Sequence, residues 1–104
     1  MTDPTVTAAW QHLHELHEQL RDVHLRELFA SQPDRATTMC TEAAGLFIDW
    51  SKNLVTDDVV RQLVALADEV RVRDRIDAMF RGERINTTER RAVLHVALRA
   101  PANE

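Results

Sequence analysis

Two stretches of one-sided apolar spacing constrain what this chain can fold into. The first set is Val6, Ala9, Trp10, Leu13, Leu16 and Leu20. The second set is Val59, Val60, Leu63, Val64, Leu66, Ala67 and Val70. Apolar residues spaced three and four positions apart line one face of an α-helix and leave the other face polar. The spacing therefore predicts amphipathic helices over about residues 7–21 and 57–71.

Residues at the predicted helix starts support both assignments. Thr5 or Thr7 can cap the first helix, because a threonine hydroxyl accepts a hydrogen bond from a free amide in the first turn. Thr56 can do the same for the second helix. Asp57 and Asp58 follow at once, and their charges suit the positive end of the helix.

Three shorter helices are also expected. They cover about residues 24–32, 73–81 and 87–99. Pro33 cannot continue the first, and Gly82 is placed to end the second in a left-handed conformation. Asn86 with Glu89 three residues later makes a capping box that predicts the start of the third.

Between these helices the pattern changes to a period of two. After an interruption at residues 42–45, Leu46, Ile48 and Trp50 alternate with Phe47, Asp49 and Ser51. Alternation of this kind is typical of a strand, so we expect a short β-hairpin over about residues 37–51. A helix from Thr41 to Leu46 is the alternative, because Glu-Ala-Ala is good helical sequence.

The chain has 104 residues, which allows one small domain, and no linker or repeat divides residues 1–104. Two glycines and three prolines favour a helical over a loop-rich fold. The predicted fold class is therefore mainly α with a short β-hairpin.

The charge pattern and the cysteine content limit the partners and the cellular compartment that we expect for this chain. The net charge is −4, and residues 71–99 contain eight arginines interrupted by four carboxylates, so no continuous basic face indicates a nucleic-acid partner. The single cysteine, Cys40, is compatible with a reducing cytoplasm. We find neither a secretion leader nor an apolar run of membrane-spanning length, and we expect a cytoplasmic protein with no membrane partner.

Few residues suggest chemistry on their own. His14 and His17, with Glu18, could approach a metal ion, but no third ligand is fixed by the spacing, so solvated histidines are the better interpretation. His95 has no local partner for catalysis, which favours packing or hydrogen bonding. The pair Thr87-Thr88 lacks the glycines that a phosphate loop needs, which favours a helix cap.

Three ordered segments carry a resemblance to a known family. They are residues 22–30 (DVHLRELFA), 45–53 (GLFIDWSKN) and 79–99 (MFRGERINTTERRAVLHVALR). In this order and spacing they resemble the N-terminal part of glucose-6-phosphate isomerases, also called phosphoglucose isomerases. Arg71 stands where such sequences often carry a glycine between helices.

The resemblance implies a fold and an activity for the whole family chain. It implies the N-terminal helical part of an α/β sugar isomerase, not a complete domain. The family interconverts glucose 6-phosphate and fructose 6-phosphate in glycolysis and gluconeogenesis, with a glutamate moving a proton between C1 and C2. Its phosphate-binding and catalytic residues lie downstream of the matched part. We therefore expect no catalytic, substrate-binding or metal residue here, and no cofactor.

Two functional hypotheses follow. In the first, the chain is an N-terminal fragment of the isomerase, inactive alone. Its partners are then the remainder of the isomerase chain and the dimer partner, and sugar phosphate binds only the full enzyme. In the alternative, it is a stand-alone helical protein-interaction module derived from the isomerase N-terminus.

Overall fold

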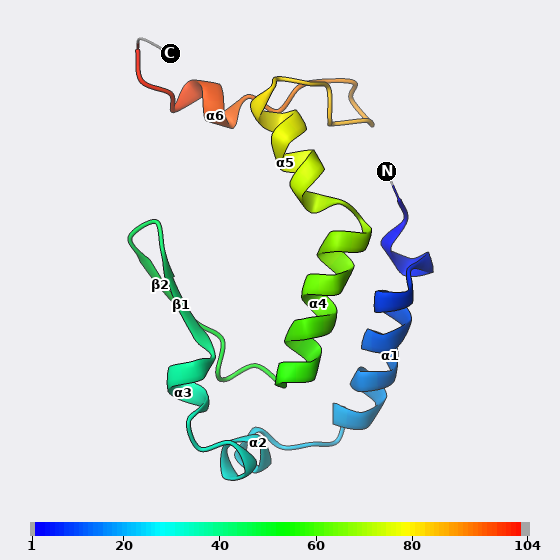
Figure 1. The fold of residues 1–104 in the computed structure, drawn as a ribbon, viewed down its shortest axis with the longest axis vertical. Coiled ribbons are helices and arrows are strands. Elements are labelled where there is room, and N and C mark those ends of the chain that lie inside the picture. The colour runs from blue at the N-terminus through cyan, green and yellow to red at the C-terminus, as the bar shows by residue number, and fades with distance from the viewer. Residues whose placement is uncertain (1, 103–104) are drawn as a thin grey trace.

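The computed structural model describes residues 2–102 (Figure 1). In chain order the elements are η1 (Pro4–Val6), α1 (Ala8–Leu20), α2 (Leu25–Ser31), α3 (Arg35–Thr38), β1 (Cys40–Ala43), β2 (Leu46–Asp49), α4 (Asp57–Glu69), α5 (Val72–Phe80) and α6 (His95–Leu98). The predicted class, mainly α with one antiparallel hairpin, is confirmed. The predicted helices 7–21, 24–32, 57–71 and 73–81 correspond to α1, α2, α4 and α5 within two residues at each end.

The helices α1 and α4 lie side by side and run antiparallel, with α1 at the edge of the molecule (Figure 1). The Thr7 hydroxyl accepts a hydrogen bond from the Trp10 amide at 3.2 Å, and the Thr56 hydroxyl accepts one from the Val59 amide at 3.3 Å. Both caps agree with the sequence prediction. The alanine and valine at the contact, Ala9 and Val59, are among the few buried side chains.

Glu69, in the last turn of α4, links the end of α4 to the start of α1. Its carboxylate oxygens accept hydrogen bonds from the amides of Ala8 at 3.2 Å and Ala9 at 3.0 Å. These amides belong to the first turn of α1, where free donors and the helix dipole favour a negative charge. One side chain therefore caps a helix that lies about sixty residues away in sequence.

The hairpin is shorter than predicted. Its register pairs Cys40 with Asp49 and Ala43 with Leu46. Ala44 and Gly45 form the turn with φ of 52° and 76°, the left-handed values that a two-residue hairpin turn requires. The expected start at residue 37 was wrong, because residues 35–38 form α3 instead.

The short helix α3 owes its existence to threonine hydroxyls. Those of Thr37 and Thr38 donate to the Asp34 carbonyl at 2.9 and 3.2 Å, and both backbone amides donate to the same carbonyl at 3.0 Å. Such local bonds compete with strand pairing, and because of them residues 37 and 38 are helical and do not join the hairpin. The alternative of a helix from Thr41 to Leu46 is not what the structure contains, since this stretch forms the hairpin.

Arg35 joins α3 to the segment between the hairpin and α4. Its side chain is almost fully buried, at 1% exposure. Its guanidinium donates to the carbonyls of Ser51 (3.2 and 2.9 Å), Asn53 (3.0 Å) and Val55 (2.8 Å). The ring of Phe29 lies 5.4 Å from the guanidinium carbon, within cation–π distance. The rigid fork of donors thus satisfies three carbonyls of an irregular loop.

The C-terminal third differs most from the prediction. Arg71 adopts φ of 60° between α4 and α5, the left-handed conformation for which glycine is favoured. Gly82, at φ of 76°, ends α5 as predicted.

The predicted helix 87–99 was wrong over most of its length, since only α6 (His95–Leu98) is helical. Asn86 Oδ1 does accept from the Glu89 amide at 3.3 Å, as the capping box predicts. The path then turns at Arg90, with φ of 56°, and Asn86 pairs with Arg91 through two backbone bonds of 3.0 and 3.2 Å. The left-handed residue and this bridge prevent the turn from propagating as a helix.

Taken together, the elements form a thin, curved body rather than a packed globule (Figure 1). Its extents are 51 × 35 × 18 Å and its radius of gyration is 17.8 Å, against about 13 Å for a compact chain of this length. Its accessible surface is 8374 Å², against about 6,000 Å² for a compact folded protein of this mass. The excess, about 2,400 Å², is surface that the chain does not cover by itself.

We expect Arg35→Lys to lower the free energy of unfolding by about 2 kcal/mol, because a single ammonium cannot reach all three carbonyls and leaves at least one unpaired. Urea denaturation followed by tryptophan fluorescence measures this loss. Arg26→Lys on the exposed side of α2 is the matched control. Equal midpoints for the two variants would contradict the role given to Arg35.

We expect Glu69→Ala to cost about 1 kcal/mol of stability through loss of the cap on α1. Asp68→Ala, at the exposed neighbouring position, should cost less. Circular dichroism during thermal unfolding compares the two. A larger loss for Asp68→Ala would refute the capping contact.

Candidate functional site

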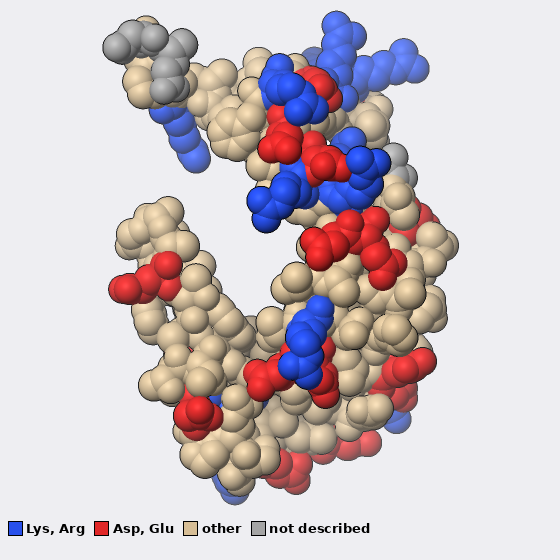
Figure 2. Space-filling model, viewed as in Figure 1, with Lys and Arg blue, Asp and Glu red and all other residues tan. Residues whose placement is uncertain are grey.

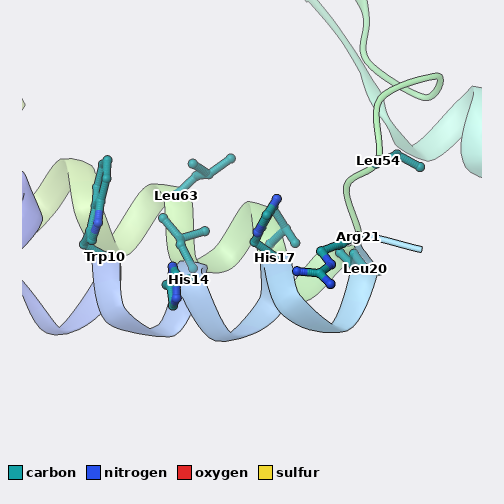
Figure 3. A pocket seen from close by; sticks show the side chains of 9 residues that line it. Trp10, His14, His17, Leu20, Arg21, Leu54 and Leu63 are labelled. Atoms are coloured by element: carbon teal, nitrogen blue, oxygen red, sulfur yellow. The ribbon is translucent and has the colours of Figure 1, made fainter. Parts of the chain in front are cut away.

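An apolar groove lies between α1, α4 and the loop that precedes α4, with a volume of about 530 Å³. It is lined by Trp10, Leu13, His14, His17, Leu20, Arg21, Leu54, Val59 and Leu63. In Figure 3, Trp10, His14, His17 and Leu20 follow one another along α1, and Leu63 projects from α4 beside them. We call this surface the α1–α4 groove.

The lining of the α1–α4 groove is suited to an apolar partner. Most lining groups are aliphatic or aromatic, and no aspartate or glutamate is among them. A pocket for a small polar substrate instead needs several converging donors and acceptors. Trp10 and Leu63 remain 40% and 47% exposed, so the groove presents large apolar groups to its surroundings.

The histidines that were considered as metal ligands both lie on this groove. His17 Nδ1 is 3.8 Å from a carboxylate oxygen of Glu18, and the other Glu18 oxygen is 3.4 Å from Arg21 Nη1. Within residues 2–102 no group of three or more histidine, cysteine or acidic side chains is arranged to hold a metal ion. The structure thus places both His14 and His17 in the lining of the apolar groove.

Two further apolar surfaces lie outside the groove. On β2, Leu46, Phe47 and Ile48 are 63%, 64% and 50% exposed. Around α5 and α6, Phe80 and Leu98 are 66% and 85% exposed. Apolar area of this extent marks contact surfaces with other protein.

The arginine-rich segment is a mixed surface and not a basic one. Figure 2 shows blue and red side chains intermingled over α5 and the region beside it. Arg71 pairs with Asp74, and Arg81 Nε lies 2.8 Å from a Glu83 oxygen. The hydrogen bond and charge of Glu83 raise the pKa of Arg81 above its ordinary value. The mixture agrees with the sequence argument against a nucleic-acid surface.

The other residues singled out in the sequence take structural or exposed positions. Asp57 and Asp58 lie in the first turn of α4, as expected for helix-end charges. His95 is exposed at the start of α6. Thr88 donates its hydroxyl to Asn86 Oδ1 at 2.9 Å within a turn. No helix in the described part of the chain is long and apolar enough to cross a bilayer.

Sequence reasoning missed the feature that shapes this surface. Apolar spacing identified the stripes of α1 and α4, including Leu63, but it did not indicate that Leu63 lines an open groove. Leu54 was not singled out at all. The Ser51-to-Val55 loop that carries Leu54 is positioned by Arg35, and no local motif marks that arginine.

The thin shape, the open apolar groove and the hairpin with its exposed apolar side chains indicate a helical segment of a larger protein. Comparison with known proteins identifies which one. A family model described as phosphoglucose isomerase matches residues 49–104, and the chain belongs to that family.

Curated relatives match nearly the whole chain. It is 60% identical to glucose-6-phosphate isomerase of Roseiflexus castenholzii over 97% of this chain, 50% identical to that of Nitrosospira multiformis over 100%, and 54% identical to that of Gloeobacter violaceus over 96%. The chain spans only 19%, 19% and 18% of the length of these three relatives. The suspected resemblance is therefore confirmed, as is the view that this is a small segment of the larger isomerase.

The α1–α4 groove should bind an apolar probe. We expect Leu63→Glu to reduce the fluorescence of anilinonaphthalene sulfonate added to the chain, because the substitution puts a charge inside the groove. Val64→Glu adds the same charge at a 58% exposed position that does not line the groove, and should leave the signal close to that of the parent chain. An equal reduction by both variants would argue against the groove as the binding surface.

Proposed function

We propose that these 104 residues serve as the N-terminal part of a glucose-6-phosphate isomerase, which interconverts glucose 6-phosphate and fructose 6-phosphate. The observation that carries the proposal is the 60% identity to the Roseiflexus castenholzii enzyme over 97% of this chain. Identity at this level over 97% of the chain, with family-model support for residues 49–104, favours a shared role.

In this proposal the segment supplies a docking face and no catalytic group. Isomerisation needs an acid–base group and phosphate ligands that converge on one small substrate. The α1–α4 groove is apolar and its lining contains no carboxylate, which supports a packing role. The excess surface of the chain supports it too, because such area is stabilised only when another part of the protein covers it.

The partners follow from the same proposal. They are the remainder of the isomerase chain and, in the assembled enzyme, its dimer partner. Sugar phosphate is bound by the complete enzyme only. The location proposed is the cytoplasm, which the single cysteine supports, since a reducing compartment does not call for disulfides.

A chimera tests the proposal. In this chimera, residues 1–104 of this chain replace the matching segment of the Roseiflexus castenholzii enzyme. The formation of fructose 6-phosphate is followed in a coupled assay. We expect the chimera to turn over substrate and the 104-residue chain to be inactive, because only the chimera contains the catalytic groups.

The parent Roseiflexus enzyme, expressed and assayed in parallel, controls for the host sequence. Turnover by the 104-residue chain alone would contradict the absence of catalytic groups. A folded but inactive chimera would contradict the assignment of this segment to the enzyme.

A further inference from the structure

A histidine occupies the N-cap of α2, a position where serine, threonine, asparagine and aspartate are the common residues. Nδ1 of His24 accepts a hydrogen bond from the Arg26 amide at 3.0 Å. A carboxylate oxygen of Glu27 accepts one in return from the His24 backbone amide at 3.3 Å, which completes a capping box. The start of α2 therefore depends on a ring nitrogen that can take up a proton.

The bond to Nδ1 requires a neutral imidazole. A neutral ring has one N–H donor and one bare nitrogen that accepts, whereas both nitrogens of the protonated ring are donors. Because Nδ1 of His24 accepts the amide bond, the ring proton lies on Nε2. A proton on Nδ1 would point at the Arg26 amide and would place positive charge at the positive end of the helix dipole. The cap and the protonated ring are therefore mutually exclusive.

The two carboxylates nearest to the cap along the chain do not reverse this effect. Asp22 precedes His24, and Glu27 lies in the first turn of α2. Glu27 is exposed, and attraction between exposed charges changes a local equilibrium by about twofold. Loss of an N-cap changes it by about fivefold. Protonation of His24 therefore weakens α2 although acidic groups lie nearby.

The charged groups that neighbouring elements bring toward α2 keep their charge in the relevant pH range. Arg35 of α3 meets the helix at Phe29, whose ring lies 5.4 Å from the guanidinium carbon. At the end of α1, Arg21 pairs with Glu18 at 3.4 Å. Carboxyl groups ordinarily titrate near about pH 4, and arginine stays charged. Between about pH 5 and pH 8, histidine is the side chain that changes charge.

We propose that His24 is a pH-sensitive cap, which holds α2 in place at neutral pH and releases it when the imidazole is protonated. The unfolded chain binds this proton more readily than the capped helix does, so α2 is most stable above about pH 7 and loses stability as the pH falls toward about 5. Release also moves the Phe29 ring from the guanidinium of Arg35, which fixes the loop before α4. The switch is independent of the proposed function.

Amide hydrogen exchange of the 104-residue chain, resolved by NMR, tests the proposal. The informative amides are those of residues 29–32, including Gln32, which donates to the Leu28 carbonyl at 3.0 Å. Each rate is divided by the intrinsic rate of an unstructured amide at the same pH. The opening of α2 should increase at least about fivefold between about pH 8 and about pH 5. Equal opening at the two pH values overturns the proposal.

Substitutions assign the pH dependence to one ring. His24→Asn keeps a capping side chain that does not titrate, so α2 should open equally little at both pH values. His24→Ala removes the cap and should open α2 about fivefold more at the higher pH, with little further change at the lower pH. His12→Gln, at an exposed position inside α1, is the control and should keep the pH dependence of the parent chain. The same pH dependence in the parent and in His24→Asn overturns the proposal.

The ring itself provides a measurement that needs no substitution. Nitrogen chemical shifts of the imidazole distinguish a bare ring nitrogen from a protonated one. At about pH 8 the Nδ1 atom of His24 should be bare and Nε2 should carry the proton. A proton on Nδ1 at this pH overturns the proposal, because that tautomer cannot accept the hydrogen bond from the Arg26 amide.

Discussion

The hydrogen bonds of the Arg35 guanidinium are the interaction on which the shape of this chain depends. Four hydrogen bonds to the carbonyls of Ser51, Asn53 and Val55 fix the loop between β2 and α4 against α3. The start of α4, the position of Leu54 in the groove and the base of the hairpin all follow from that loop. A buried cation is tolerable there because its donors are used and Phe29 lies over it.

The contacts of Arg35 and Glu69 fix the arrangement of the backbone segments, but these segments do not enclose a hydrophobic core. The buried apolar side chains are small or scattered, namely Ala9, Leu28, Met39, Val59 and Ala78. Polar contacts thus define the geometry, while most apolar area faces outward. This division is expected for a segment whose hydrophobic stabilisation comes from the rest of a larger protein. Family membership and the 19% share of the relatives' length agree with it.

Local signals predicted the elements better than their arrangement. Thr7, Thr56 and Gly82 act at short range, and each ends or begins a helix where the sequence indicated. The helix predicted over residues 87–99 was wrong although the Asn86 cap formed. Arg90 adopts a left-handed conformation instead of continuing the helix, because Asn86 and Arg91 pair in a β-bridge. The α1–α4 groove could not be predicted, because apolar periodicity shows which face of a helix is apolar but not whether another part of the protein covers that face. Arg35 was missed because its partners are backbone carbonyls sixteen to twenty residues away.

A crystal structure of the chimera would test the central claim most directly, namely that the exposed apolar surface of this chain is completed by the remainder of an isomerase. The account predicts that residues 2–102 keep the fold described here and lose about 2,400 Å² of accessible surface, with Trp10, Phe47 and Phe80 buried. A structure in which these three side chains remain open to solvent would contradict it.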